Sequence, residues 1–418
     1  MTNRIELELV RIKDIGTVKT GRTPPTAVAS NFGDEYLFVT PSDMDGRKRI
    51  DDTERKVSSQ GASVLASCRL PANSVCVSCI GWQMGKVVMT TQTCFTNQQI
   101  NTIIPNDKVL PDFLYYNLST RREEFQTLGS VGTRTPILKK SLFENLGIYL
   151  PPVPIQRKIA GILSGYDRLI ENNTRRIEIL EEMARSIYRE WFVNFRFPGH
   201  EQVQMVDSEL GLIPEGWEVV ALQDITSYIN RGISPKYDDN SVSIVINQKC
   251  IRDGRLNLEL ARKHNKKVPF DKLVRFGDVL VNSTGVGTLG RVAQVYQNIQ
   301  DCSIDSHVSI VRPNERVNID YFGLTLVKLE PHFSDLGVGA TGQTELRRQS
   351  LSETVVLIPP QHFQGKFSDI VAPMRQLCLK LSTKNGFLGQ TRDLLLPRLI
   401  SGEIDVENLD INTSQIAA

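Results

Sequence analysis

The sequence lacks a long apolar run, and it lacks a strong excess of charge. No segment approaches the roughly 20 apolar residues that a membrane-spanning helix needs. The opening residues, MTNRIELELVRIKDIG, lack the apolar core of a secretory signal. We therefore expect a cytoplasmic protein whose seven cysteines are free thiols. The formal net charge of +2 gives no reason by itself to expect a nucleic-acid partner, so any basic surface must be local.

One local candidate runs from Lys249 to Arg291, where ten Lys and Arg residues stand against four Asp and Glu residues. Such a cluster is typical of a surface that meets phosphate groups. On charge alone, a solvated lysine-rich loop explains the segment equally well.

Recognisable catalytic and metal-binding motifs are also missing. The sequence has no GxxxxGK[ST] phosphate loop, no [DN]PP[YF] tetrapeptide of adenine methyltransferases, and no recognisable nucleophile–base or carboxylate pair. His264, His307 and His332 have no neighbours at metal-ligand spacing. Cys76-x-x-Cys79 lies in an alternating strand pattern without a second CxxC, which favours buried thiols over zinc. We expect no catalytic residue and no metal on this chain.

A glycine-rich motif, Gly285-Val286-Gly287-Thr288-Leu289-Gly290, spells the GxGxxG of dinucleotide-binding proteins. In those proteins the glycines open a helix whose N-terminus faces the pyrophosphate. Here the strand-like RVAQVYQ follows, so a strand–turn–strand hairpin is the better interpretation. Its glycines would allow the backbone to come close to another molecule, such as DNA.

A long helical pattern follows Leu150-Pro151-Pro152-Val153-Pro154, a stretch that cannot continue a helix because proline lacks the N–H. No further proline occurs until Pro198. Apolar residues recur at spacings of three and four, the pattern of a coiled-coil seam, with polar interruptions at Asn173 and Arg176. Such a helix would be roughly 60 Å long and would need a partner helix. The predicted seam consists of Ile159, Ile162, Tyr166, Leu169, Asn173, Leu180, Met183 and Ile187.

The two halves of the chain are copies of one another, at an offset that stays near 210 residues. Asp14-Ile15 matches Asp224-Ile225, and Pro151-Pro152 with Gln156 matches Pro359-Pro360 with Gln364. Further matches pair SVCVSCIG with DVLVNSTG, GKV with GRV, and IIPN with IVRPN. A duplication therefore predicts two related globular domains, each followed by a long helix.

The second helix is the partner that the first one needs. Its seam has polar breaks at Lys384 and Thr391. The simplest packing sets the two helices antiparallel and relates the domains by a pseudo-twofold axis. The alternative is two independent helices, each lying on its own domain. The predicted second seam consists of Phe367, Ile370, Met374, Leu377, Leu381, Leu388 and Leu395.

The fold class that follows is α+β, with two duplicated mixed α/β domains separated by two long helices that form an antiparallel coiled coil. We expect a first globular domain at 1–150, a central helical spacer at 151–197 and a polar, unpatterned linker at 198–214. A second globular domain at 215–358, a distal helical spacer at 359–402 and a C-terminal tail at 403–418 complete the chain.

Three segments carry a resemblance to a known family. LPPVPIQRKIAGILSGYDRLIENNTRRIEILEEMARSIYREWFVNFRF, GLIPEGWEVVAL and RDLLLPRLISGEIDV resemble the specificity subunits of type I restriction–modification systems. The resemblance covers the whole chain, with two variable target-recognition domains and two helical segments in the expected order. It implies that each domain reads one half of a bipartite target in double-stranded DNA. Because the two domains differ greatly from each other, we expect a non-palindromic target.

The same resemblance implies the partners and the absence of an active site. The helices would set the separation of the half-sites and dock two methyltransferase (modification) subunits, and restriction (translocase–nuclease) subunits would join that core. Adenine methylation with S-adenosylmethionine and cleavage driven by ATP with Mg would occur on those partners. No cofactor is expected on this chain.

Candidate DNA-contacting residues are polar or basic side chains in predicted turns that follow strands. Those of the second domain are chosen as counterparts of the first. In the first domain they are Thr20, Arg22, Thr23, Gln83, Lys86, Gln98, Arg134 and Lys139, and in the second Arg231, Ser234, Lys236, Asn282, Ser283, Thr288, Arg291, Gln343 and Arg347.

Three other functions remain open from the sequence. A stand-alone DNA- or RNA-binding scaffold would use the same domains without methyltransferase partners, and co-purification of a chain carrying NPPY or DPPF argues against it. An enzyme acting alone on DNA conflicts with the missing motifs. A homodimeric coiled-coil adaptor is disfavoured because the two helices can pair within one chain.

Overall fold

The structure is a computed structural model that describes residues 7–130, 135–339 and 344–411. The chain divides into two compact units. The first comprises Met1–Asn172 with Lys384–Ala418, and the second comprises Asn173–Thr383. Each unit therefore contains one mixed α/β domain together with one half of each long helix. The predicted α+β fold class is confirmed. No helix among the described residues is both long enough and apolar enough to span a membrane.

The domain of the first unit is built on a five-stranded sheet of order β2-β9-β6-β7-β4. A three-stranded sheet, β5-β3-β8, and a pair, β1-β10, complete its strands. The strands are β1 (Glu8–Arg11), β2 (Gly16–Thr20), β3 (Phe32–Val39), β4 (Arg49–Ile50), β5 (Lys56–Val57), β6 (Val75–Ser78), β7 (Val87–Thr90), β8 (Cys94–Thr96), β9 (Ile100–Pro105) and β10 (Gly147–Leu150). The helices are α1 (Ser59–Val64), α2 (Pro111–Ser119), α3 (Arg122–Gly129) and α4 (Lys140–Glu144).

The domain of the second unit repeats this plan with a four-stranded sheet, β14-β22-β19-β20, a three-stranded sheet, β18-β15-β21, and a pair, β13-β23. Its strands are β13 (Glu218–Ala221), β14 (Thr226–Arg231), β15 (Ile244–Ile246), β16 (Ile251–Arg252), β17 (Arg255–Leu256), β18 (Arg262–Lys263), β19 (Val279–Asn282), β20 (Val292–Gln294), β21 (Cys302–Ile304), β22 (Val308–Pro313) and β23 (Val355–Ile358). Its helices are α6 (Ile319–Lys328), α7 (Glu330–Asp335) and α8 (Arg348–Ser352). In both units the strand from the middle of the domain, β9 or β22, lies between the first long strand and a hairpin, in agreement with the predicted duplication.

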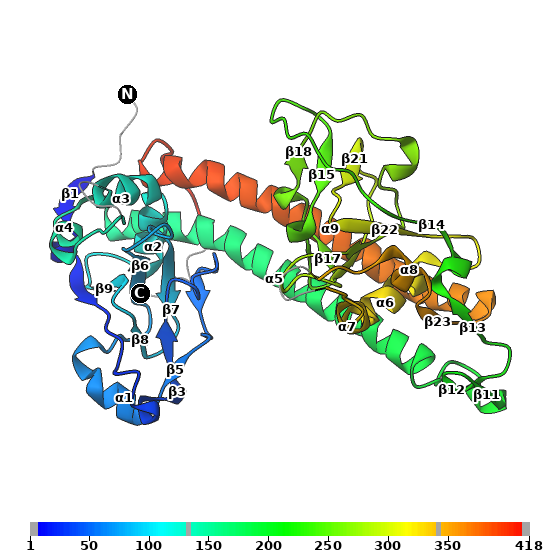
Figure 1. Cartoon of the computed structure of the whole chain (residues 1–418). Coiled ribbons are helices and arrows are strands. Elements are labelled where there is room, and N and C mark those ends of the chain that lie inside the picture. Colours follow the sequence, from blue (N-terminus) through cyan, green and yellow to red (C-terminus); the bar gives the residue numbers. More distant parts are fainter. Residues whose placement is uncertain (1–6, 131–134, 340–343, 412–418) are drawn as a thin grey trace. The chain divides into compact units, whose positions relative to one another are not determined.

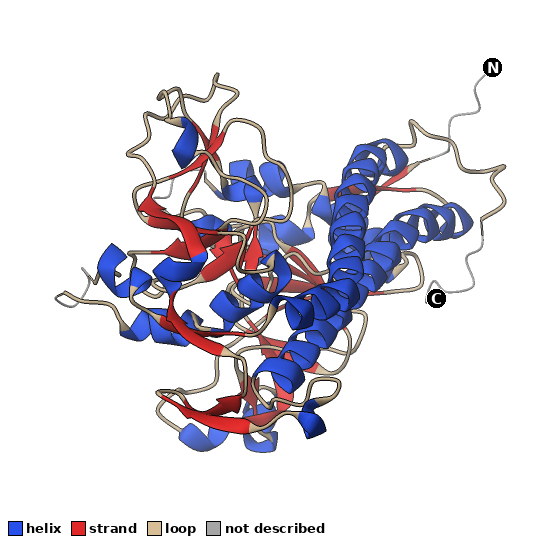
Figure 2. Ribbon diagram, turned by 90° about the vertical axis from the view of Figure 1, so that its right-hand side faces the viewer, coloured by secondary structure: helices blue, strands red, loops and turns tan. Residues whose placement is uncertain are grey.

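The two long helices are α5 (Val153–Phe192) and α9 (Gln361–Ile400), and they pack side by side (Figures 1 and 2). In the first unit the carbonyl of Ile170 accepts a hydrogen bond from Asn385 at 3.3 Å. In the second unit the carbonyl of Ile177 lies 3.9 Å from the Cys378 thiol. Residue numbers fall along α9 as they rise along α5, so the pairing is antiparallel, as predicted.

The predicted seam of α5 differs from the structure at two positions. Leu169 and Met183 are 49% and 45% exposed, whereas Asp167, which was not predicted for the seam, is buried and pairs with Arg392 of α9. Ile370 of α9 is also exposed, so the prediction was wrong for these three residues. A buried Asp inside a helix seam is costly unless it is paired, and its partner could not be identified from the sequence. The other predicted seam positions are buried or half-buried.

Each long helix contributes to the core of the domain beside it. Ile155, Ile159 and Leu163 of α5 belong to the apolar core of the first unit. At the other end of α5, Tyr188 and Phe192 pack with Phe367 of α9 in the core of the second unit, where the Phe192 and Phe367 ring centroids are 4.9 Å apart. The aromatic ending of the first helix is therefore a packing motif that joins helix to domain.

The segment at 198–214 differs from the unpatterned linker predicted for it. It contains an antiparallel hairpin of β11 (Met205–Ser208) and β12 (Gly211–Pro214). Gly211 has a φ of +91°, which favours glycine and allows the tight turn. The hairpin was missed because its strands carry little apolar alternation, and Met205, Val206 and Leu212 are exposed.

Candidate nucleic-acid interface

The predicted contact residues of the first domain meet at one end of its five-stranded sheet. Antiparallel strands alternate in direction. The same end of the sheet, called this edge below, therefore holds the end of β2, the start of β9, the end of β6 and the start of β7. The register confirms this, because Thr20 pairs with Asn101 and Ser78 pairs with Ile100. The loops at this edge, residues 20–23, 97–99, 80–86 and 135–139, are named here the first loop end.

Hydrogen bonds join the loops of the first loop end to one another. Thr23 donates to Gln98 of a second loop at 2.8 Å, and within the hairpin loop Lys86 donates to Gln83 at 3.0 Å. Thr20 donates to Asn101 at 2.6 Å. Arg22 and Gln98 are exposed, and Gln83 is exposed beside the half-buried Lys86. Residues that are 75 positions apart in the sequence thus form a single polar surface.

The loop before α4 reaches the same edge. The backbone N–H of Gly81 donates to the carbonyl of Pro136 at 2.9 Å, and that of Leu138 donates to Cys79 at 2.8 Å. Lys139, one of the predicted contacts, is exposed at this position. Arg134, another predicted contact, lies outside the described residues.

The first loop end is built from segments that contain no carboxylate. No Asp or Glu occurs from Arg55 to Asn106, a stretch that supplies two of its four loops, and none occurs from Phe125 to Phe143, which supplies a third. Loops without carboxylates of their own lessen the repulsion from phosphate groups even where cations are few. These loops can therefore suit a partner rich in phosphate groups, although the net charge of the whole chain is only +2.

The second domain has a corresponding edge, formed by Arg231–Lys236, Asp305–His307, Asn282–Arg291 and Thr344–Arg347, which we name the second loop end. Arg231 pairs with Ser309 and Asn282 pairs with Val308, so the equivalent strand ends again meet. Leu346 donates its backbone N–H to Ser283 at 2.8 Å, as Leu138 does to Cys79 in the first domain. The predicted contacts Ser234, Lys236 and Arg347 are exposed there, and Thr288 is half-buried.

Two predicted contacts of the second domain do not reach the surface. Asn282 and Ser283 are fully buried. The Asn282 amide donates to the carbonyl of Gln248 at 3.2 Å, and the Ser283 hydroxyl lies 2.6 Å from that of Ser309. The sequence placed them in a turn, but they belong to the end of β19 and to its interior hydrogen bonds. Gln343 lies outside the described residues.

Two predicted arginines of the second domain are partly engaged inside it. Arg231 forms an ion pair with Glu345 at 2.7 Å and donates to the carbonyl of Leu346. Arg291 donates to the carbonyl of Gly287 at 2.9 Å. Both side chains are half-buried and support loops of the second loop end.

The basic segment from Lys249 to Arg291 is not one loop, because β16, β17, β18 and β19 lie within it. Lys266 donates to the carbonyl of Ser234 at 2.9 Å and Lys272 to that of Gly232 at 3.3 Å. Arg255 instead pairs with Glu181 of α5 at 2.5 Å. Part of this positive charge therefore supports the second loop end and part of it holds the domain on the helix.

The GxGxxG segment joins β19 to β20 as an antiparallel hairpin, as the sequence predicted. Gly285, Gly287 and Gly290 have positive φ angles of 115°, 69° and 79°, which only glycine adopts readily. Cys76 and Cys79 are buried free thiols, and burial raises the pKa of each to about 12. Among the described residues, no group of His, Cys, Asp and Glu is arranged to hold a metal ion.

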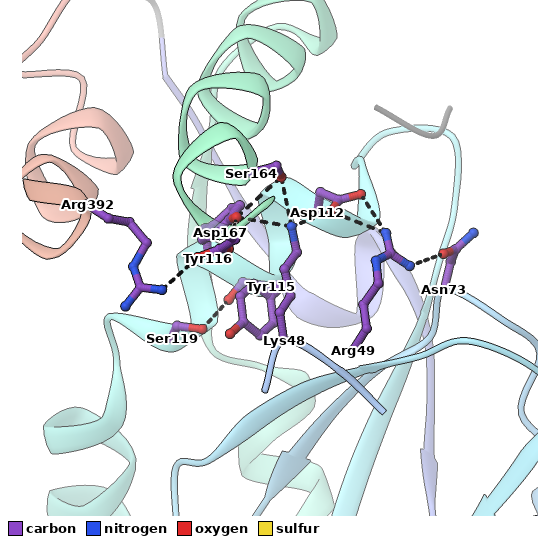
Figure 3. A network of polar contacts seen from close by, with 10 residues as sticks. All are labelled: Lys48, Arg49, Asn73, Asp112, Tyr115, Tyr116, Ser119, Ser164, Asp167 and Arg392. Carbon is purple, nitrogen blue, oxygen red and sulfur yellow. Dashed lines mark hydrogen bonds and ion pairs between the residues drawn. The ribbon is translucent and has the colours of Figure 1, made fainter. Parts of the chain in front are cut away.

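A buried polar network, which the sequence did not reveal, fixes the first domain to both long helices (Figure 3). Lys48 pairs with Asp112 of α2 at 2.5 Å and donates to Ser164 of α5 at 2.8 Å. Burial lowers the pKa of Lys48 even though the Asp112 carboxylate opposes this. Because a buried charge without its partner is strongly unfavourable, this network resists any change in how the domain sits on α5.

The same network reaches α9. Tyr116 of α2 donates to Asp167 of α5, and Arg392 of α9 pairs with the other oxygen of that carboxylate at 2.6 Å. Burial, and then the charge of Asp167, raise the pKa of Tyr116. One carboxylate therefore joins α2, α5 and α9.

The second unit has a related attachment between α6 and α9. Asp320 pairs with Arg375 at 2.6 Å and accepts a hydrogen bond from Ser368 at 2.6 Å. Tyr188 of α5 donates to Thr325 of α6 at 3.1 Å. Both domains are thus held on the helices by buried polar contacts in addition to apolar packing.

The glutamine of the repeated Pro-Pro…Gln motif makes equivalent hydrogen bonds in both units. Gln156 accepts from the backbone N–H of Leu110 at 2.9 Å and donates to the carbonyls of Lys108 and Pro151. Gln364 accepts from Asn318 at 2.7 Å and donates to Arg316 and Pro359. Each buried amide connects the start of a long helix to the loop before α2 or α6, which explains why the motif recurs.

Comparisons with known proteins agree with this architecture. The type I restriction modification DNA specificity domain family matches residues 5–182. The MjaIX type I restriction enzyme specificity subunit of Methanocaldococcus jannaschii is 28% identical over 96% of this chain and 94% of its own length. Residues 5–182 therefore match the type I restriction–modification DNA specificity domain, and nearly the whole chain is similar to a type I specificity subunit. The HindI specificity subunit of Haemophilus influenzae is 32% identical over 42% of this chain and 38% of its own length.

The fold of this chain is similar to that of a solved structure. The crystal structure of a type I restriction–modification S subunit from M. genitalium aligns with a TM-score of 0.59 at 17% identity, covering 96% of this chain and 97% of that one. At this identity, the likeness concerns the fold alone. It agrees with the two domains and the helix pair described above.

Proposed function

We propose that this chain is a type I specificity subunit that reads a bipartite, non-palindromic target in double-stranded DNA, with one loop end on each half-site. The observation that carries the proposal is the gathering of predicted contact residues at one edge of each sheet, in the first domain on segments without carboxylates. Exposed Arg and Lys residues would hold phosphate groups, and Gln83 and Gln98 would read base edges.

The helix pair would act as the spacer between the half-sites. It is fixed to each domain by buried polar contacts and apolar cores, so its length is transmitted to the separation of the loop ends. Asn173, which is buried near the middle of α5, would help to fix the register of the pair, as a polar seam residue can.

The outer faces of the helices would dock two methyltransferase subunits, and restriction subunits would join that core. Exposed apolar side chains support this, since Ile179 and Met183 lie one turn apart on α5 and Phe387 and Leu394 lie seven residues apart on α9. S-adenosylmethionine, ATP and Mg would act on those partners, and this chain would carry out no catalysis. Incorporation of labelled methyl groups into DNA by the purified chain alone would overturn that part of the proposal.

A length change at the boundary between the units tests the spacer. Seven residues of helical sequence are inserted after Asn172 and seven more after Thr383, so that both helices lengthen together and their pairing is preserved. At 1.5 Å per residue, this adds about 10 Å, or about three base pairs, to the gap between half-sites. Methylated adenines are mapped in DNA from cells that carry the complex.

The control adds the same seven residues after Ala418, which leaves the helix pair unchanged. We expect the control to keep the original target and the double insertion to lengthen only its unspecified gap. An unchanged gap would contradict the spacer function while leaving half-site recognition intact.

A further inference from the structure

We propose that Trp82 is an apolar contact to the DNA bases, and that its indole packs against a base of the first half-site. This inference rests on the proposed DNA recognition and deepens it, because it assigns a role to a residue outside the polar set. The indole is 83% exposed at the β6–β7 hairpin of the first loop end. Large aromatic side chains are seldom left this exposed without a partner.

The hairpin that carries Trp82 is held rigidly. Ser78 donates its hydroxyl to the carbonyl of Gln83 at 2.7 Å and accepts from the N–H of Lys86 at 2.9 Å. Met84 donates its N–H to Gly81 at 3.0 Å, and its side chain is completely buried. A base would therefore meet an indole on an ordered loop, and little loop entropy would be lost on binding.

The glycines of this hairpin adopt backbone angles that other residues rarely adopt. Gly81 and Gly85 have φ angles of +82° and +85°. A Cβ on Gly85 would also come within 2.7 Å of Arg122. The sequence around Trp82 is thus constrained to present the indole outward.

The surroundings of Trp82 favour DNA over a protein as its partner. Its neighbours on the hairpin are Gln83 and Lys86, and the chain has no carboxylate from Arg55 to Asn106. Lys139, on the adjacent loop, is exposed. A protein partner would gain from mixed charges at the rim of a contact, whereas a polyanion gains from loops that carry no carboxylate of their own.

The second loop end repeats the feature with a smaller side chain. Val286 follows Gly285 directly, as Trp82 follows Gly81, and it is 79% exposed. Exposed apolar residues at equivalent hairpin tips of duplicated domains are explained if both contact a base. The apolar contact would be larger in the first half-site than in the second.

Intrinsic fluorescence gives a direct test, because Trp82 is the exposed one of three tryptophans. Trp191 and Trp217 are 9% and 5% exposed, in the core of the second unit. The full chain, assembled with its methyltransferase subunits, is titrated with a duplex that carries the target recovered by methylation sequencing. The emission of Trp82 is taken as the difference between wild type and Trp82→Phe, which cancels the tryptophans of the partner subunits.

We expect the target duplex to quench the Trp82 signal and to protect it from acrylamide. Trp82→Ala should weaken target binding by roughly 10- to 150-fold, as expected when a large apolar side chain is no longer buried in the contact, while Trp82→Phe should keep most of the affinity. The dependence of affinity on salt should not change in either variant, because no phosphate contact is lost. Val64→Ala, which truncates an exposed apolar side chain on α1, is the matched control and should bind like wild type.

The outcomes separate this inference from the proposed function. Wild-type binding with an unchanged Trp82 signal and undiminished Trp82→Ala affinity would overturn the inference alone. A change in the Trp82 signal on adding methyltransferase subunits without DNA would also overturn it, because a protein surface would then cover the indole. Failure of the wild-type complex to prefer its target over unrelated duplexes would overturn the proposed function itself.

Discussion

Asp167 of α5 accepts a hydrogen bond from Arg392 of α9 at 2.6 Å, although the two residues are 225 positions apart in the chain. The Asp167 carboxylate is almost completely buried and also accepts the hydroxyl of Tyr116. Burial by itself would lower the pKa of Arg392, but the hydrogen bond and charge of Asp167 outweigh it and raise that pKa. The pair therefore fixes the helices to each other at the point where α2 of the first domain rests on them.

We predict that Arg392→Ala destabilises the first unit by about 1–2 kcal/mol. This lies below the range for a fully buried pair, because the arginine side chain is 31% exposed and partly screened. Hydrogen exchange in α2 and the first half of α5 measures the loss locally, without assuming that both units unfold together. Arg398→Ala is the control on the same helix. Its ion pair with Glu403 is exposed on both sides, so protection should be unchanged.

We predict that Gln156→Ala and Gln364→Ala each destabilise their own unit by about 1–3 kcal/mol, because each leaves a backbone N–H without its acceptor in a buried place. Thermal unfolding and exchange at Leu110 or Asn318 would report the effect. Gln361→Ala tests the same truncation on an exposed glutamine with a single hydrogen bond, to Glu315, and should change stability by less than about 0.5 kcal/mol. Equal effects at all three glutamines would contradict the structural role of the motif.

We predict that Lys139→Ala weakens binding to target and unrelated DNA alike and lowers the salt slope of the affinity by about 1, as expected for the loss of one phosphate contact. Lys140→Ala is a closely matched control, because its ammonium group pairs with Glu144 at 3.3 Å on α4. Binding isotherms at several salt concentrations distinguish the two lysines. A selective loss for one base pair of the target would mean that Lys139 reads sequence instead.

We predict that stability falls as the pH rises from about 9 to 12, in part because of the buried thiols. In the folded chain, burial raises the pKa of Cys76, Cys79 and Cys302 to about 12, above the ordinary value of 9.0 for an accessible thiol. Between these values the folded state holds protons that the unfolded state has released. The stability that the protonated, buried thiols contribute is therefore fully present below pH 9, and it is lost as the pH approaches 12.

The same burial should protect these thiols from reagents. At neutral pH in the native protein, we expect an alkylating reagent to modify the half-buried Cys68 before Cys76 or Cys79. Mass spectrometry of the labelled peptides measures the order. Early labelling of Cys76 would contradict the packing of β6.

The duplication and the two long helices could be predicted from the sequence, because each rests on a pattern that many residues share. The exact seam could not, since apolar residues occur on two adjacent faces of α5. Ile179 and Met183 belong to the exposed face, and the buried face includes Asp167. A carboxylate inside a helix seam is acceptable here because Arg392 and Tyr116 satisfy it, and those partners come from distant parts of the chain.

The candidate interface was predictable in location but not residue by residue. Turns after equivalent strands led to Gln83, Gln98 and Lys139, which meet at one edge. Whether a turn residue faces outward depends on where its strand ends, and β19 extends far enough to bury Asn282. Trp82 was not among the predicted contacts because it is neither polar nor basic, although it matches Val286 in the repeat.

The most direct measurement is the sequencing of methylated adenines in DNA from cells that carry this chain with its modification subunits. The wild type is compared with a double variant that combines Gln83→Ala and Gln98→Ala. For the wild type, we predict two short specified blocks that differ from each other and are separated by an unspecified gap of fixed length. In the double variant, we predict relaxed specificity in one block and an unchanged second block and gap. A single continuous site, or relaxation of both blocks together, would contradict recognition of one half-site by each loop end.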